Sequence, residues 1–378
     1  MNNSITLPAI FLAYQTPGFH LPLFLPALSL TIPATIGIIL NSSVCYITWK
    51  YWGKYTTFKS KASILLAINS FLEIGHQSGH FVFFFISLTG INFIPVSLAI
   101  KLQGHSIVCD NIVIIMFFTM SFERVIAVAF PIFYANLNFR FYIFLHILPI
   151  FTLSVFILYQ MMSQIVAYPD FPVTGSLADI FGLTSIIDSR LIYGPLLLAS
   201  ILLHIIVGFL VKYKGDLANE KLRKLFRSLS LIVFVNIGGY FTFTVIFLLI
   251  MAFLPISPEM IWYLSGYLAV ILNISAAVNA PILYFNSSDY NTAYKKEFGI
   301  IKSKLIKNNT TQHLLQIATD LESSVKILKN SYDKDTQPEN KVIIDCIKLY
   351  FDDYQEQITS AIGAMMREIA PLMATIKK

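Results

Sequence analysis

Long apolar stretches separated by short polar connections dominate the chain from residue 21 to residue 285. A helix of about 20 apolar residues crosses the hydrocarbon core of a bilayer, and seven stretches reach that length. They predict an all-α membrane protein built as a bundle of seven transmembrane helices. The expected spans are Leu21–Trp49, Ala62–Thr89, Leu102–Val128, Phe141–Ser163, Leu191–Lys212, Leu225–Leu254 and Met260–Phe285.

The basic residues fall on alternate connections between these spans. Lysine and arginine cluster after spans one, five and seven, whereas the opposite connections hold only Lys101 and Arg190. By the positive-inside rule the N-terminus is expected outside the cell and the C-terminus inside. On that orientation the glycosylation sequon at Asn2 is the one that lies on the outer side.

Composition supports membrane insertion. Of 378 residues, 56% are hydrophobic and 13% are charged, and the mean hydropathy is +0.68. Because the net charge of +6 comes from short clusters between apolar runs, it indicates topology rather than a nucleic-acid partner. The cysteines, Cys45, Cys109 and Cys346, show no CxxC spacing and no obvious disulfide pair. No cofactor is expected.

Polar residues recur at spacings of three and four along the second predicted span and so share one helical face. Such a face is costly against lipid and is expected to point into the bundle, where an acid and an amide of span three can meet it. Two interpretations remain open, a hydrogen-bonded contact between helices and a floor for a ligand or an ion. The residues are Asn69, Glu73, His76, Gln77, His80, Asp110 and Asn111.

Two other functions use some of the same features. Glu73, His76 and His80 have zinc-ligand chemistry at helical spacing, which is compatible with an intramembrane zinc hydrolase. However, the chain has no HExxH, no GxSxG and no phosphate-cradling GxxxxGK[ST] motif, so neither an enzyme nor a metal site is favoured. A ligand-gated cation channel remains a second alternative, and it requires the inverted topology.

A charged pair, Glu123 and Arg124, stands near the end of the third predicted span, before the helix-stopping Pro131. A charge at this depth costs at least a few kcal/mol unless it reaches water, is neutralised or serves a switch. The pair therefore predicts either two side chains that snorkel to the interface or a conformational switch.

The seventh predicted span ends in the segment Asn279–Tyr284. Pro281 frees a backbone carbonyl and predicts a kink, with Asn279 as a possible partner for the freed group. The residues that follow predict a short amphipathic helix on the inner leaflet, with Tyr290, Tyr294 and Phe298 turned toward lipid.

These features together resemble a rhodopsin-like G-protein-coupled receptor, with Glu123-Arg124-Val125 at the end of span three and Pro-x-x-Tyr in span seven. A finer similarity, over about residues 30 to 298, is to the nematode chemoreceptor family called serpentine receptor class sx. The segments that carry it are Ser60–Leu66, Ile126–Val128, Phe130–Tyr134, Arg227–Leu229, Asn273–Ser275 and Asn286–Tyr290.

The resemblance implies a chemosensory receptor rather than an enzyme. It implies a plasma-membrane location, with the sensory cilium as a narrower candidate, an extracellular small-molecule or peptide ligand, and a heterotrimeric G protein as partner. It also implies that Glu123 and Glu220 restrain Arg124 until the ligand favours a state in which span six moves away. Asn279, Pro281 and Tyr284 would then belong to the same activation switch.

The chain departs from the pattern of such receptors at several positions. Many of them join span three to the second outer loop by a disulfide, but Ala99 stands about where that cysteine would be, and residues 164–190 contain none. Asn279 lies one place earlier than an Asn-Pro-x-x-Tyr motif would put it. Gly238 and Gly239 are the candidate flexible point of span six.

The predicted organisation has three parts: an extracellular N-terminus (1–20), a receptor domain (21–298) and a cytosolic tail (299–378). In the tail, apolar residues recur on one helical face over Leu314–Leu328 and again over Val342–Ile376, with Pro338 between them. The pattern predicts a helical hairpin that packs on itself or on a cytosolic partner.

Overall fold

The computed structural model describes residues 9–184, 189–214, 220–255 and 257–307, and these are helical almost throughout. The expected tail hairpin and Asn2 lie outside the described residues. The elements are α1 (Ala9–Tyr14), α2 (Leu21–Lys50), the 3-10 helix η1 (Thr56–Lys59), α3 (Lys61–Ser78), α4 (His80–Leu88), β1 (Ile94–Pro95), α5 (Val96–Ala129), α6 (Pro131–Asn136), α7 (Phe139–Ala167), β2 (Pro172–Val173), α8 (Leu177–Thr184), α9 (Ser189–Lys214), α10 (Glu220–Phe253), α11 (Pro258–Ala277), α12 (Asn279–Asn286) and α13 (Ser288–Lys307).

The chain forms two compact units, residues 1–298 and 299–378. The described part of the second unit is residues 299–307, the C-terminal part of α13. The receptor and tail roles given to these units stay predictions.

In the described part of the chain, six helical segments are long and apolar enough to cross a membrane. Together they correspond to the predicted spans one and three to seven, and each differs from its prediction by a few residues at the ends. They are Leu21–Lys50, Val96–Ala129, Phe139–Ala167, Tyr193–Leu210, Ser230–Ile250 and Pro258–Asn286.

The second predicted span is built differently from the others. It is two consecutive helices, α3 and α4, interrupted at Gly79. A Cβ atom at Gly79 would lie 2.3 Å from the Ser106 hydroxyl of α5, so the missing side chain allows the two helices to approach closely. The α3 helix begins at Ser60, whose hydroxyl accepts a 3.2 Å hydrogen bond from the Ser63 amide, a standard N-cap.

The seventh predicted span is also divided. Its first helix, α11, begins with a Ser257 cap followed by Pro258 at the first helical position. It ends at Ala277, and α12 resumes at Asn279. The break lies three residues before Pro281, where proline cannot supply the amide that a continuous helix needs. The structure thus shows an interruption of the helix in the region where the sequence predicted a kink.

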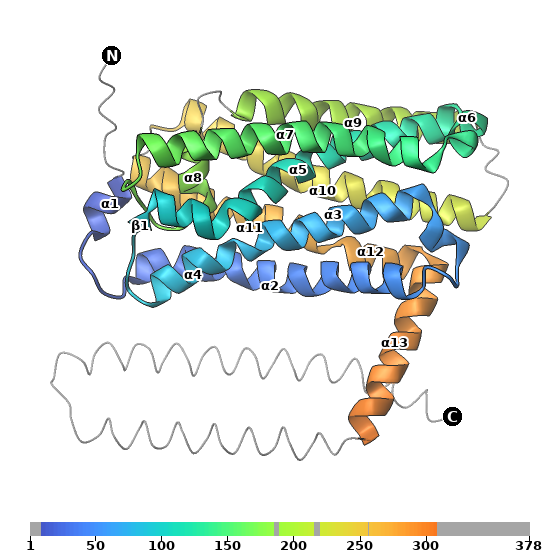
Figure 1. Ribbon diagram of the computed structural model, residues 1–378, viewed down its shortest axis with the longest axis horizontal. Coiled ribbons are helices and arrows are strands. Elements are labelled where there is room, and N and C mark those ends of the chain that lie inside the picture. The colour runs from blue at the N-terminus through green and yellow to red at the C-terminus, as the bar shows by residue number, and fades with distance from the viewer. Residues whose placement is uncertain (1–8, 185–188, 215–219, 256, 308–378) are drawn as a thin grey trace. The chain divides into compact units, whose positions relative to one another are not determined.

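The long helices of the first unit lie side by side, and α5 contacts α3, α7, α9 and α10 (Figure 1). The elements α1, β1 and α8 gather at one end of this bundle and α6 lies at the other (Figure 1). We call these the α8 end and the α6 end.

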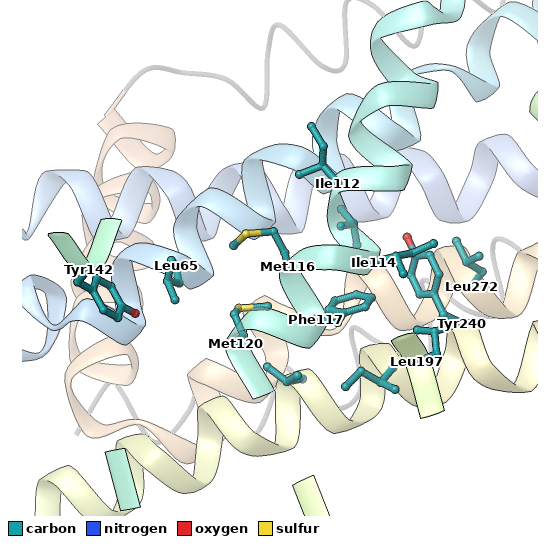
Figure 2. Close-up of a cluster of buried hydrophobic side chains, with 13 residues drawn as sticks. Leu65, Ile112, Ile114, Met116, Phe117, Met120, Tyr142, Leu197, Tyr240 and Leu272 are labelled. Carbon is teal, nitrogen blue, oxygen red and sulfur yellow. The ribbon is translucent and has the colours of Figure 1, made fainter. Parts of the chain in front are cut away.

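A core of buried apolar side chains surrounds α5 midway along the bundle (Figure 2). Met116, Phe117 and Met120 of α5 are at most 1% exposed, and they pack in one cluster with Leu197 of α9 and Tyr240 of α10. Burial of such side chains stabilises a fold by about 1.5–3 kcal/mol each in water, and close packing takes over this role in lipid.

The orientation predicted for α13 is wrong for two of its three aromatic residues. Tyr290 and Tyr294 are 0% and 6% exposed, and their hydroxyls meet Thr48 and Ser43 of α2 at 2.9 and 2.8 Å. Burial raises the pKa of Tyr290 to about 12, so its hydroxyl stays neutral. Because α2 offers hydroxyl partners, this face of the helix packs on protein rather than lipid.

Candidate functional site

The polar face of α3 is buried inside the bundle. Its centre is a contact between two acids and one imidazole. Glu73 Oε2 lies 3.3 Å from His76 Nδ1, and Asp110 Oδ1 of α5 lies 3.4 Å from His76 Nε2. Glu73 is 0% exposed and His76 is 3% exposed. The structure therefore brings together three of the residues that the sequence singled out, and we call Glu73, His76 and Asp110 the central triad.

Tyr240 of α10 closes the central triad from a third helix. Its hydroxyl lies 3.3 Å from His76 Nδ1 and 3.4 Å from Asp110 Oδ1. Its ring packs edge-on against Phe117 at 5.2 Å between centroids, and both residues are visible in the core (Figure 2). The triad and Tyr240 thus join α3, α5 and α10.

A second polar branch runs from α3 and α4 to α11. The Gln77 amide donates to the Asn273 carbonyl at 3.4 Å, and the Asn273 amide lies 3.1 Å from His80 Nε2. The rings of His76 and His80 are 5.6 Å apart between centroids. Gln77 and His80 therefore belong to the same polar region as the central triad, and this branch extends it to a fourth helix.

Two predicted residues are buried without joining the triad through a hydrogen bond in the described structure. The Asn111 amide donates to the Ile107 carbonyl of its own helix at 2.6 Å, and Asn69 has neither amide atom hydrogen-bonded. Both side chains are at most 2% exposed.

A chain of amides lies further toward the α6 end. Asn236 of α10 donates to Asn279 Oδ1 at 2.8 Å, and Asn279 donates to Asn41 Oδ1 of α2 at the same distance. The Asn279 amide also lies 3.4 Å from the Ser70 hydroxyl of α3. Asn279, predicted as part of a switch, therefore bridges three helices at the break in the seventh predicted span.

At the α6 end, Glu123 and Arg124 form an ion pair, with 3.1 Å between Glu123 Oε2 and Arg124 Nε. Both residues are at most 3% exposed. The Tyr134 hydroxyl of α6 donates to Glu123, and burial together with this carboxylate raises the pKa of Tyr134. The Lys61 ammonium donates to the carbonyls of Tyr134 and Leu137 at 2.6 and 3.0 Å. The buried pair is thus held between α3, α5 and α6.

Tyr284 and Glu220 are two further switch candidates. The Tyr284 ring packs against Tyr294 of α13 at 6.1 Å between centroids, and the Tyr284 carbonyl accepts a 2.7 Å hydrogen bond from Asn291. Glu220 is the first residue of α10, and its side chain lies outside the described residues.

At the α8 end, the segment 168–184 is fixed to α5 by backbone hydrogen bonds. β1 and β2 pair antiparallel, with Ile94 opposite Val173, and the Val96 amide donates to the Phe171 carbonyl at 2.8 Å. The Gln103 amide adds a 2.5 Å bond to the Gly175 carbonyl. This ladder holds the connection between the fourth and fifth predicted spans against α5, and the two cysteines of the described residues, Cys45 and Cys109, are both free.

Asp179 of α8 connects the same segment to α11. It accepts a 2.7 Å hydrogen bond from the Trp262 indole and bonds from the amide and hydroxyl of Thr174. Burial raises the pKa of the Asp179 carboxyl, and these hydrogen bonds oppose the rise. The connection between the fourth and fifth predicted spans is therefore hydrogen-bonded to both α5 and α11 at the α8 end.

No group of three or more His, Cys, Asp or Glu side chains in residues 9–307, where described, is arranged to hold a metal ion. The zinc set suggested by Glu73, His76 and His80 is accordingly not assembled, since His80 contacts Asn273 instead.

Sequence reasoning missed Tyr240 and Asn273, which contact α3 and α4, and Asn41, which contacts α11 and α12. Each is one polar side chain in a span whose other polar residues do not form a face. The available signal was the cost of placing an amide in lipid, which predicts that Asn41 and Asn273 face the bundle interior.

Comparison with known proteins gives one assignment. A search of curated proteins finds no match. Residues 34–298, more than half of the chain, match the family model described as the serpentine type 7TM GPCR chemoreceptor Srsx. This is a receptor family, and together with the six apolar spans it makes the protein a multi-pass membrane protein. The chain therefore belongs to the Srsx family of serpentine seven-transmembrane chemoreceptors.

Proposed function

We propose that the protein is a G-protein-coupled chemosensory receptor of the plasma membrane, with its N-terminus outside and α3–α4 as the second of seven spans. It binds an extracellular small molecule or peptide near the central triad and activates a heterotrimeric G protein inside the cell. In this proposal residues 299–378 form a cytosolic tail that packs on itself or on a cytosolic partner.

The observation that carries this proposal is the contact of Tyr240 with the central triad. Tyr240 belongs to α10, and Asn236, one turn away on the same helix, donates to Asn279 at 2.8 Å. A ligand that changes the contacts of Tyr240 therefore acts on a helix that is hydrogen-bonded to the break between α11 and α12. This is a physical route from the triad toward the α6 end.

The buried ion pair at the α6 end is the proposed output of this route. An ion pair removed from water is costly and is sensitive to any change in its surroundings. We place Glu123 and Arg124 in the restrained state of the receptor, with Asn279, Pro281 and Tyr284 at the moving end of the seventh span. Glu220 keeps its proposed role as a second partner of Arg124.

The function is tested in membranes that contain the full-length protein and purified heterotrimeric G proteins. Ligand-stimulated nucleotide exchange is measured for the wild type and for Tyr240→Phe, which removes the hydroxyl but keeps the ring on Phe117. We expect the variant to shift ligand potency or basal exchange severalfold. Tyr267→Phe, which alters a 45% exposed ring on α11, is the matched control and is expected to behave like the wild type.

Two results would overturn the proposal. One is the absence of nucleotide exchange with every G-protein class across a chemically broad ligand library. The other is an N-terminus in the cytosol, measured by glycosylation at Asn2 or by protease protection of an N-terminal tag. That topology would instead agree with the ligand-gated channel of inverted orientation.

A further inference from the structure

The charges of the central triad do not balance. Both carboxylates, Glu73 and Asp110, meet the same imidazole, at 3.3 and 3.4 Å. Even a doubly protonated His76 carries one positive charge against two negative charges. Burying a charge without a counter-charge is expensive, and a proton or a cation must compensate for it. The triad therefore has the electrostatics of a site for one additional positive charge.

An unsatisfied carboxylate oxygen of the triad points to the same kind of ligand, and further unsatisfied buried oxygens lie on α3, α5 and α11. Glu73 is 0% exposed, and its Oε1 atom has no hydrogen-bond partner, while Oε2 meets His76. The side-chain oxygens of Gln77, Asn111 and Asn273 are also buried without a partner. These three amides already use their nitrogen donors on backbone carbonyls.

In each of these three side chains the amide nitrogen has a hydrogen-bond partner and the amide oxygen has none. Asn69 alone adds an unsatisfied donor as well as an acceptor. Since buried polar groups are hydrogen-bonded in nearly all folded proteins, the region calls for a guest that is rich in donors. A carboxylate or phosphate group would meet oxygen atoms and is disfavoured.

Aromatic rings flank the triad. Tyr240 is 3% exposed and is supported by Phe117 (Figure 2). Tyr193 of α9 packs against the same apolar cluster. Aromatic faces attract organic cations. An inorganic ion makes no apolar contact with these rings. An amine with an organic substituent can contact both the carboxylates of the triad and the aromatic rings.

We infer that the receptor recognises a small organic molecule through a protonated amine, which binds between the carboxylates of Glu73 and Asp110. The inference rests on the proposed function, because it places the ligand in the same site. The ammonium supplies the positive charge and the donors that the triad lacks, and its organic substituent packs against Tyr240. The Tyr240 hydroxyl, which contacts both His76 and Asp110, is then displaced or reoriented.

The test uses the purified full-length protein and a panel of aryl-alkyl amines, each paired with the alcohol and the carboxylic acid of the same skeleton. Thermal stability is measured at fixed ionic strength, with sodium chloride alone as a separate arm. We expect at least one amine to raise Tm in the wild type while its alcohol and acid partners do not. Removing one buried charge partner is expected to weaken amine binding more than about tenfold.

Three variants separate a ligand role from a structural one. Glu73→Gln and Asp110→Asn each remove one negative charge and keep the shape of the side chain. Both are expected to lose the amine shift and to keep or raise the ligand-free Tm, because the unbalanced charge is gone. A purely structural ion pair would lower the ligand-free Tm instead. Asp170→Asn, at an exposed position of the connection before β2, is the control and should retain the amine shift.

The inference is overturned if no amine stabilises the wild type more than its alcohol, if sodium alone reproduces the shift, or if the amine shift survives both Glu73→Gln and Asp110→Asn. A neutral or acidic ligand that drives nucleotide exchange would also overturn it while leaving the proposed receptor function intact. An amine that binds without nucleotide exchange under any condition would support the site and count against the receptor function.

Discussion

The charged groups at the α6 end and those at the centre of the bundle differ in how their charges are paired. At the α6 end, Glu123 meets the Arg124 guanidinium and the Tyr134 hydroxyl. Glu297 of α13 likewise receives the Lys50 ammonium at 2.8 Å and the Tyr51 hydroxyl at 2.7 Å. In the centre, two carboxylates share one imidazole, so negative charge is in excess.

This difference in charge pairing indicates where the molecule can respond to a ligand. A buried ion pair of balanced charge favours one arrangement of its helices, whereas an excess of buried negative charge is relieved by a positive charge that binds beside it. A ligand can shift a conformational equilibrium only by its differential affinity for the two states. A central region with an excess of negative charge offers such a difference, and we propose that the ion pair at the α6 end belongs to the restrained state.

The largest expected effect is that of Arg124→Ala, which removes the cation of the ion pair at the α6 end. We expect ligand-dependent nucleotide exchange to fall to its ligand-free level, because the restrained cation proposed to meet the G protein is gone. Insertion and surface delivery should remain, since Glu123 keeps the Tyr134 hydroxyl as a donor. Surface labelling and nucleotide exchange are measured on the same cells.

Arg140→Ala supplies the control for this prediction. Arg140 also lies at the α6 end, at the start of α7, but it is exposed. Its loss should leave exchange close to the wild-type level. Full signalling by Arg124→Ala would show that the buried pair only stabilises the fold.

The second prediction concerns the helix between the two regions. Gly239 precedes Tyr240 on α10, and a Cβ atom there would lie 2.0 Å from the Ser275 hydroxyl and 2.3 Å from the Ser275 Cβ atom of α11. Gly239→Ala therefore forces the two helices apart, and overpacking of this kind costs about 1–3 kcal/mol. We expect a lower Tm and a changed ligand response, because Tyr240 moves with the helix.

The neighbouring Gly238 provides a matched control for this test. A Cβ atom at Gly238 would meet nothing within 4 Å, so Gly238→Ala should be neutral or slightly stabilising. Adding Ser275→Gly to Gly239→Ala removes the clash and should restore most of the Tm. Equal losses from both alanine variants would mean that helix flexibility, rather than close packing, matters at this pair.

The sequence alone predicted the features that depend on local order. Span lengths follow from apolar runs, and the shared face of Glu73, His76 and Gln77 follows from the helical repeat. The contact between Glu73 and His76 is likewise a contact between neighbouring turns. The break at Gly79 was not predicted, because it depends on how closely α5 approaches.

The sequence could not identify partners that are distant along the chain. Helical periodicity placed Tyr290 and Tyr294 on one face, but it could not show that Thr48 and Ser43 of α2 would cover that face. The contact of Tyr240 with His76 joins residues 164 positions apart. Such contacts depend on helix packing, which no local pattern encodes.

The smallest expected effect is a pH dependence in the attachment of α13. Burial acts to raise the pKa of Glu297, but hydrogen bonds from Lys50, Tyr51 and Tyr46 outweigh it and hold that pKa below its ordinary value of 4.5. A lowered folded-state pKa stabilises the protein above pH 4.5, and this stabilisation is lost as the pH falls through the lowered pKa. Glu297→Gln should therefore lower Tm by a few degrees at pH 7, and by progressively less as the pH falls below 4.5.

Tyr51→Phe separates the contribution of one donor in this network. It leaves the Lys50 bond to Glu297 in place and removes the 2.7 Å bond from the tyrosine. The expected loss of Tm is smaller than for Glu297→Gln and fades over the same pH range. A Tm difference that stays constant as the pH falls from 7 to well below 4.5 would show that the Glu297 side chain acts through packing. Charge pairing would then contribute less to the stability of the α6 end than we infer from the comparison with the centre of the bundle.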